Sequence, residues 1–177
     1  YEDLIDLKAY LDSLPKSSHQ PVGHKLGFPF NIRQGLGLWK KLYLDGKTLS
    51  RAETRADKLS VGRYLVEGPG HCAACHSPRN LIGGEIADAR YSGATELEQQ
   101  PGKKPGKVPN ITPHADGIGS WSEKDIAYAL ETGLDPDFDS FGGSMVSVQE
   151  NMAKLTAADR EAIAAYLKSL PTVPSSK

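Results

Sequence analysis

Two cysteines and a histidine stand within five consecutive residues of this chain, in the run Cys72-Ala73-Ala74-Cys75-His76. Two thiols three positions apart on one turn of backbone can each form a thioether with a vinyl group of one haem. The adjacent imidazole of His76 then lies under the iron and supplies the proximal axial ligand. The opposite face of the iron takes a second side chain or a small molecule. The spacing therefore predicts one covalently bound haem c.

Two other chemistries use cysteines at this spacing, namely a structural zinc site and a thiol redox pair. A zinc site needs four ligands, usually with a second Cys or His pair, and the remaining histidines form no such pair: His19, His24, His71 and His114. A redox CxxC normally follows a strand in a βαβ pattern, whereas the residues before Cys72 indicate a helix and a Gly-Pro-Gly turn. Both alternatives stay open, but covalent haem is the better interpretation.

The elements that must position the motif carry helical signals separated by turns. A short helix is expected over about 59–66, where Gly62 permits close approach of another backbone. Capping boxes at 122–125 and 156–159 open two further helices, and the second carries Ile163, Tyr166, Leu167 and Leu170 on one face. Between the motif and the first box lie long stretches rich in Gly and Pro. The pattern predicts an all-α fold with long turn-rich loops around the haem.

Composition sets limits on size, charge and partners. With 177 residues, of which 38% are hydrophobic, and with 18 Gly and 12 Pro, the chain suits a small domain whose apolar cofactor supplies part of the core. A net charge of −1 gives no reason to expect nucleic acid as a partner. No stretch approaches the length of apolar sequence that spans a membrane. The chain begins at Tyr1, already in a helical pattern, so we expect a piece of something longer.

The two ends of the chain resemble each other in sequence. Residues 8–15, KAYLDSLP, match residues 164–171, AAYLKSLP, at the same helical spacing and with the same terminating Pro. A chance likeness between two amphipathic helices is one interpretation. The other is that residues 1–14 are the last helix of a truncated preceding haem domain.

The remaining boundaries follow from this interpretation. Residues 15–56 are then a linker or N-terminal extension with one amphipathic helix, which carries Ile32, Leu36, Trp39 and Tyr43. Residues 57–177 form the haem domain. A second haem is expected in the missing upstream domain.

The region from about 59 to 171 resembles a class I cytochrome c domain. More narrowly, it is similar to the second haem domain of bacterial di-haem cytochromes c that serve periplasmic dehydrogenases. The likeness rests on CAACH, SPRN at 77–80, VPNIT at 108–112, GIGSW at 117–121, GGSM at 142–145 and the closing AYLKSLP. It implies a class I fold whose first and last helices cross beside the haem edge, so that Gly62 and either Tyr64 or Leu65 meet Tyr166 and Leu167.

The resemblance also implies a methionine as the sixth iron ligand. The sequence holds two methionines, Met145 and Met152, and both lie where this family places its ligand. Met145 follows Gly142-Gly143-Ser144 and resembles the family's Gly-x-Met loop, whereas Met152 stands three residues before Leu155, a spacing suited to packing. Met145 is the preferred ligand, and Met152 or an open site remains the alternative.

Three further residues are implied to tune the haem. Pro109 resembles the proline whose carbonyl accepts a hydrogen bond from the proximal imidazole. Arg79 and Trp121 are candidate donors to the haem propionates. An ordinary surface arginine and plain core packing are the respective alternatives. Among charged segments, a basic loop with Lys103, Lys104 and Lys107 is either a solvated turn or a contact for a redox partner.

His/Met ligation would raise the reduction potential and exclude oxygen and substrates, which is the design of an electron carrier rather than an enzyme. The expected role is single-electron transfer between a dehydrogenase donor and an oxidase or cytochrome acceptor. The resemblance places it in the bacterial periplasm, soluble or tethered through missing segments. The opposing hypothesis is a haem enzyme or gas sensor in which the sixth ligand is open or displaceable.

Overall fold

The protein is described by a computed structural model that covers residues 1–47, 51–95 and 106–176. Contacts divide the chain into two compact units, Tyr1–Arg51 and Ala52–Lys177. Lys103, Lys104 and part of the glycine- and proline-rich stretch before Gly106 lie outside the described residues.

The first unit contains two helices, α1 (Glu2–Ser13) and α2 (Gly35–Tyr43). Neither helix has a buried residue. In α2 the rings of Trp39 and Tyr43, one turn apart, are in tilted contact with centroids separated by 5.0 Å. Ile32 precedes this helix and has no regular secondary structure, so α2 begins three residues later than the apolar spacing suggests. The apolar faces of both helices are therefore exposed within the described chain.

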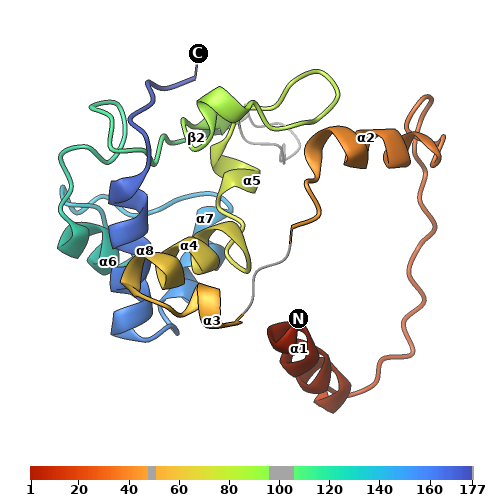
Figure 1. The fold of residues 1–177 in the computed structure, drawn as a ribbon, viewed down its shortest axis with the longest axis horizontal. Coiled ribbons are helices and arrows are strands. Elements are labelled where there is room, and N and C mark those ends of the chain that lie inside the picture. The colour runs from red at the N-terminus through yellow and green to blue at the C-terminus, as the bar shows by residue number, and fades with distance from the viewer. Residues whose placement is uncertain (48–50, 96–105, 177) are drawn as a thin grey trace. The chain divides into compact units, whose positions relative to one another are not determined.

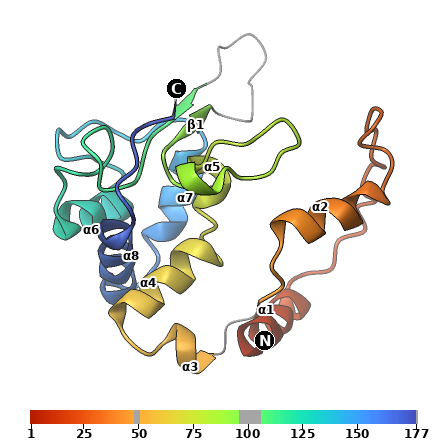
Figure 2. The same ribbon diagram turned by 45° about the horizontal axis from the view of Figure 1, so that its top comes forward.

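The second unit is built on a crossing of its first long helix with its last (Figures 1 and 2). After the short α3 (Arg51–Thr54), α4 (Lys58–Glu67) packs across α8 (Ala157–Ser169). A Cβ atom at Gly62 would lie 2.0 Å from the carbonyl oxygen of Ala162 and 2.8 Å from Cβ of Tyr166. Only glycine permits this approach, which confirms the predicted meeting of Gly62 with the last helix.

The capping signals fix the starts of the other helices. Ser122 caps α6 (Glu123–Thr132) and forms a full capping box with Asp125, and the helix ends at Gly133 in a left-handed conformation. Thr156 caps α8 in the same way by accepting a hydrogen bond from the Asp159 amide. A helix that the sequence did not predict, α7 (Met145–Met152), lies between them.

Long connections account for much of the unit, as the glycines and prolines predict. Besides α5 (Ala73–His76) and the 3-10 turn η1 (Ala87–Ala89), they contain one small antiparallel ladder that joins β1 (Ala94–Thr95) to β2 (Lys107–Val108). Two-residue strands are too short to leave an alternating pattern in a sequence, which explains why this ladder was not predicted. The predicted all-α class is otherwise confirmed.

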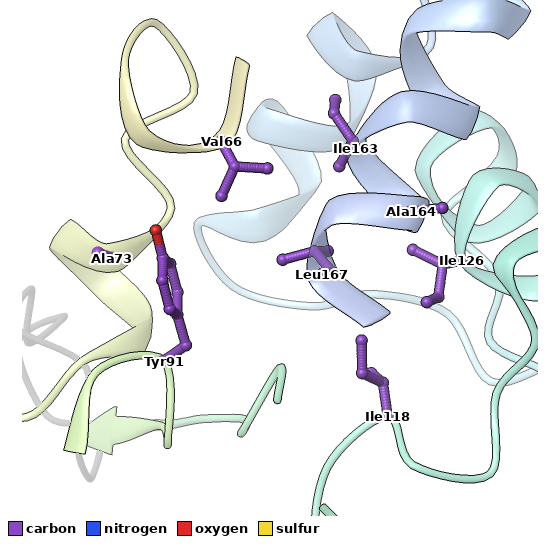
Figure 3. Close-up of a cluster of buried hydrophobic side chains, with 8 residues drawn as sticks. All are labelled: Val66, Ala73, Tyr91, Ile118, Ile126, Ile163, Ala164 and Leu167. Carbon is purple, nitrogen blue, oxygen red and sulfur yellow. The ribbon is translucent and has the colours of Figure 1, made fainter. Parts of the chain in front are cut away.

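The core lies where α4, α5, α6 and α8 converge (Figure 3). Val66, Ile163 and Leu167 face one another, and Ala73 of α5 lies beside Tyr91. Each aliphatic side chain of this size contributes roughly 1.5–3 kcal/mol when it leaves water. Because Ala73 is one of the core residues, the same cluster that joins α4 to α8 also fixes the helix that carries the two cysteines.

Candidate haem site

The two thiols lie at the ends of a single helical turn. Cys72 is the N-cap of α5, and its carbonyl accepts a hydrogen bond of 2.9 Å from the His76 amide. Cys72 is half-buried and Cys75 is exposed, and both are free thiols. Burial raises the pKa of the Cys72 thiol to about 11, the opposite of the lowered pKa that activates a thiol for redox exchange. The site therefore does not favour the thiol redox pair.

The imidazole of His76 is held in one orientation. The residue is 8% exposed, and its Nδ1 lies 2.8 Å from the carbonyl oxygen of Pro109. Because a carbonyl can only accept, Nδ1 must carry the proton and donate. Burial lowers the pKa of His76, partly opposed by this hydrogen bond, so the ring is neutral and Nε2 carries a free lone pair. This is the state in which an imidazole binds a metal.

A second loop holds the backbone of His76. The amide of Gly93 donates to the His76 carbonyl at 2.8 Å, and Ser77 Oγ accepts from the Tyr91 amide at 3.0 Å. Gly93 has a φ of +91°, and a Cβ there would lie 2.7 Å from the carbonyl oxygen of Val108. Gly93 therefore lets the loop before β1 approach the Pro109 loop closely.

The methionine helix presents one face to the interior. Met145, Gln149 and Met152 are half-buried and stand at positions i, i+4 and i+7 of α7, while the other residues of this helix are exposed. Met152 packs against the core cluster beside Leu155. Met145 begins the helix directly after the exposed Gly142, Gly143 and Ser144. Met152 thus packs against the core, whereas Met145 lies at the N-terminal end of the same helix face.

The two candidate propionate donors have other contacts in the described chain. The guanidinium of Arg79 donates to the carbonyl oxygens of Gly83 at 2.7 Å and Ala74 at 3.2 Å, and so ties the loop after α5 to that helix. Trp121 is half-buried and packs against the core cluster. A role of either side chain toward the haem stays a prediction.

The other histidines differ from His76 in their exposure and hydrogen bonds. His19, His24 and His71 are exposed, and half-buried His114 accepts a hydrogen bond from the Asp116 amide through Nδ1. Among the described residues, no group of three or more His, Cys, Asp or Glu side chains is placed to hold a metal ion. Within that part of the chain, a structural zinc site lacks a ligand set.

Sequence reasoning missed several residues that support the site. Asn110 and Thr112 are almost fully buried and bond to the segment after α8, and Gln149 joins α7 to α6. The run VPNIT includes Asn110 and Thr112 and was part of the family resemblance. It did not indicate what these two side chains contact, because their partners lie more than 60 residues away. The amide of Gln149 left no signal in the sequence.

Comparison with known proteins agrees with this geometry. The cytochrome c family model matches residues 62–171. The chain is 44% identical over 172 residues to a diheme cytochrome c-type protein of Cereibacter sphaeroides, covering 97% of this chain and 55% of that protein. It is 35% identical over 173 residues to the fructose dehydrogenase cytochrome subunit of Gluconobacter japonicus, covering 96% of this chain and 34% of that subunit.

A third relative is the gluconate 2-dehydrogenase cytochrome c subunit of Pantoea cypripedii, at 34% identity over 173 residues, which is 96% of this chain and 39% of the subunit. The protein belongs to the cytochrome c family, whose members carry covalent haem and act as electron carriers. It is related to the cytochrome subunits of dehydrogenases. The chain spans about half of the length of the diheme relative and about a third of that of the dehydrogenase subunits.

The residues present fit the group that the family implies. Two free thiols on one turn can take the two thioether bonds, and a buried neutral imidazole with its Nδ1 engaged offers Nε2 to iron. The donor set is that of a c-type haem.

Proposed function

We propose that this protein carries single electrons through one haem c ligated by His76 and Met145, from a dehydrogenase to an oxidase or cytochrome acceptor. The observation that carries the proposal is the fixed imidazole of His76, which is neutral, buried and bonded through Nδ1. When bound, the haem iron supplies the one-electron couple. The protein's contribution is to hold the haem and to set the environment of its iron.

Each ligand has a distinct task. Pro109 accepts the Nδ1 proton of His76, which orients the ring and makes Nε2 a stronger donor. Met145 supplies a soft thioether that favours the ferrous state and raises the reduction potential. Two protein ligands leave no coordination position for oxygen or a substrate, so we assign no bond-making chemistry to this site. Arg79 and Trp121 are proposed to contact the propionates.

The choice of Met145 rests on the half-buried face of α7. That face carries both methionines, and Met152 at its C-terminal end is already used in packing against the core. Gln149, one turn from Met145, donates to the carbonyl oxygen of Glu131 at 2.8 Å and fixes the helix on the end of α6. The position of Met145 on the same face is consistent with a side chain directed at the haem.

Spectra of the purified protein test the assignment. A haemochrome assay after denaturation should give one covalently attached haem per 177-residue chain. The ferric protein should show the long-wavelength sulfur-to-iron charge-transfer band of a Met-ligated haem. Absence of covalent haem would overturn the whole proposal, whereas covalent haem without this band would overturn the ligation by Met145.

The segment of residues 1–14 is proposed to be the last helix of a preceding, similar haem domain. Its Leu7 and Leu11 correspond to Ile163 and Leu167 of α8 in the repeated motif. The α8 residues are 4% and 6% exposed, whereas Leu7 and Leu11 are 50% and 54% exposed. A helix with this apolar face gains stability only when another surface covers it. The diheme relative, which is longer than this chain, supports the same interpretation.

This domain proposal is testable in a chain extended at its N-terminus with the upstream coding sequence. The extended chain should bind two haems, and Leu7→Asp should cause loss of the upstream haem only. The same substitution in the 177-residue chain should leave the melting of the second unit unchanged. Retention of both haems in the extended Leu7→Asp variant would refute the proposed packing of residues 1–14.

We propose the bacterial periplasm as the location, because haem attachment to CxxCH takes place there in the family that the chain resembles. No helix among the described residues has the length and apolar character needed to cross a membrane. Supporting evidence for a dehydrogenase donor comes from the names of the relatives, which are cytochrome subunits of fructose, gluconate and alcohol dehydrogenases. Secretion-dependent haem attachment in a bacterial host tests this location.

A further inference from the structure

The segment after α8 runs back over the two loops that hold His76. It comprises residues 173–176, here called the C-terminal strap, and lies beyond the part of the chain that the family model matches. The strap has no regular secondary structure, yet Val173, Ser175 and Ser176 each form hydrogen bonds with other segments. The Ser175 amide donates to the Asp116 carboxylate at 3.2 Å, and two further groups of contacts reach the loops that hold His76.

The first group joins the strap to the Pro109 loop. The carbonyl oxygen of Val173 lies 2.8 Å from Nδ2 of Asn110 and 2.9 Å from Oγ1 of Thr112, and the Val173 amide donates to Thr112 Oγ1 at 3.3 Å. Asn110 and Thr112 are 3% and 0% exposed. Removing the partners of such buried polar side chains would destabilise the folded state, because the buried groups would be left without hydrogen bonds. These contacts therefore constrain the loop.

The second group joins the strap to the Gly93 loop. Ser176 donates through its amide to the Ser92 carbonyl at 3.1 Å and through Oγ to the Gly93 carbonyl at 2.7 Å. Gly93 is the residue whose amide donates to the backbone carbonyl of His76. Thus one loop held by the strap bonds to the ring of His76, and the other bonds to its backbone.

We infer that the C-terminal strap is a positioning element that ties these two loops together and thereby keeps the Pro109 carbonyl on Nδ1 of the proximal ligand. The inference rests on the proposed function only in taking His76 as an iron ligand. Asn110 directly follows Pro109 in the chain. If the Asn110 side chain is no longer held, the Pro109 carbonyl that faces the imidazole can also move more. The strap acts on the iron through His76 and does not itself touch the reacting atom.

The expected effect on the iron has a definite sign. A hydrogen bond from Nδ1 to a carbonyl makes the imidazole more basic, and a more basic ligand favours the ferric state. Loosening the strap weakens that bond and therefore raises the reduction potential. A change that only destabilised the fold and admitted water to the haem would lower the potential, since an exposed haem favours the more highly charged ferric state.

The experiment compares three variants of the holoprotein: Thr112→Val, Ser176→Ala and removal of residues 172–177. The readouts are the reduction potential and the solvent exchange rate of the His76 Nδ1 proton, followed by nuclear magnetic resonance in the diamagnetic ferrous protein. We expect the exchange to become about tenfold faster in the shortened chain, with smaller increases in the point variants, and the potential to rise.

Two controls separate this effect from general weakening. Thr172→Ala removes an exposed hydroxyl next to the strap and should change neither readout. Ser122→Ala removes the N-cap of α6, which destabilises the unit far from His76 along the chain without touching either loop. Unchanged exchange and potential in all three strap variants, or an equal change in Ser122→Ala, would overturn the inference. Failure of the parent protein to show covalent haem would instead overturn the proposed function.

Discussion

His76 is 8% exposed, and two separate loops bond to its ring and to its backbone, whereas Met145 is half-buried and follows three exposed residues. The proximal side is thus fixed from several directions at once, and the methionine side depends on one short helix. Under the proposed ligation, this contrast would divide the work between the two side chains. His76 would determine whether the haem is held, and Met145 would determine what the iron can bind and at what potential it works.

The supports of the methionine side are few but specific. Gln149 joins α7 to the end of α6, and the buried guanidinium of Arg160 reaches the carbonyl oxygens of Ala153 and Leu155 and the carboxylate of Glu131, the last at 3.0 Å. These contacts satisfy carbonyls that helix ends leave without partners. They lie at the C-terminal half of α7, so the N-terminal end with Met145 is the less restrained part.

The largest effect is expected on the proximal side. His76→Ala should abolish formation of a stable holoprotein, because the iron loses its fixed ligand and a buried polar position becomes a void. Haem stain of equal amounts of protein after denaturing electrophoresis measures this. His71→Asn is the matched control, since His71 is an exposed neighbour with a φ of +35° that Asn tolerates. Normal haem content in His76→Ala would remove His76 from the account.

The next effect distinguishes the two methionines. Met145→Ala should keep the haem but let the ferrous iron take up carbon monoxide stoichiometrically, with loss of the sulfur-to-iron band and a lower potential. Met152→Ala should leave the spectrum unchanged and destabilise the fold by about 2 kcal/mol, since it packs against the core. Urea unfolding and carbon monoxide titration of both variants provide the comparison. The reverse result would assign the ligand to Met152.

A smaller effect is expected from the support of α7. Gln149→Met keeps the size of the side chain but removes the donor to the Glu131 carbonyl, which should cost about 1 kcal/mol of stability. Because the helix that carries Met145 is then freer, carbon monoxide should bind slowly but measurably. Asn151→Ala is the control, since the exposed Asn151 side chain donates to the Ser147 carbonyl of its own helix at 2.9 Å and accepts from Lys154, and neither bond reaches α6. Equal behaviour of the two variants would refute the role of Gln149.

The His76 side of the site was easier to predict from the sequence than the Met145 side, because its key residues form a local motif. Cys72, Cys75 and His76 are adjacent, so their chemistry is visible as a local motif, and the capping boxes of α6 and α8 are equally local. The crossing of α4 and α8 was predictable because Gly62 stands inside a helical pattern and the family resemblance supplied its partner.

The parts that could not be predicted depend on distant contacts. The strap meets Asn110 and Thr112 across more than 60 residues, and the ladder between β1 and β2 is too short to leave a pattern. Helix α7 contains Val146 and Val148, which favour strand over helix, and its position is set by Gln149 and Arg160 rather than by its own propensity. The roles of Arg79, Trp121 and Met145 toward the haem stay predictions.

The most direct test of the account is the visible spectrum of the reduced parent protein before and after addition of carbon monoxide. One titration reads both the haem and the occupancy of its sixth position. The account predicts c-type bands that carbon monoxide leaves unchanged, because Met145 holds the iron and the protein only transfers electrons. Ready binding of carbon monoxide would contradict the electron-carrier function as proposed and would identify this iron as a catalytic or gas-sensing site.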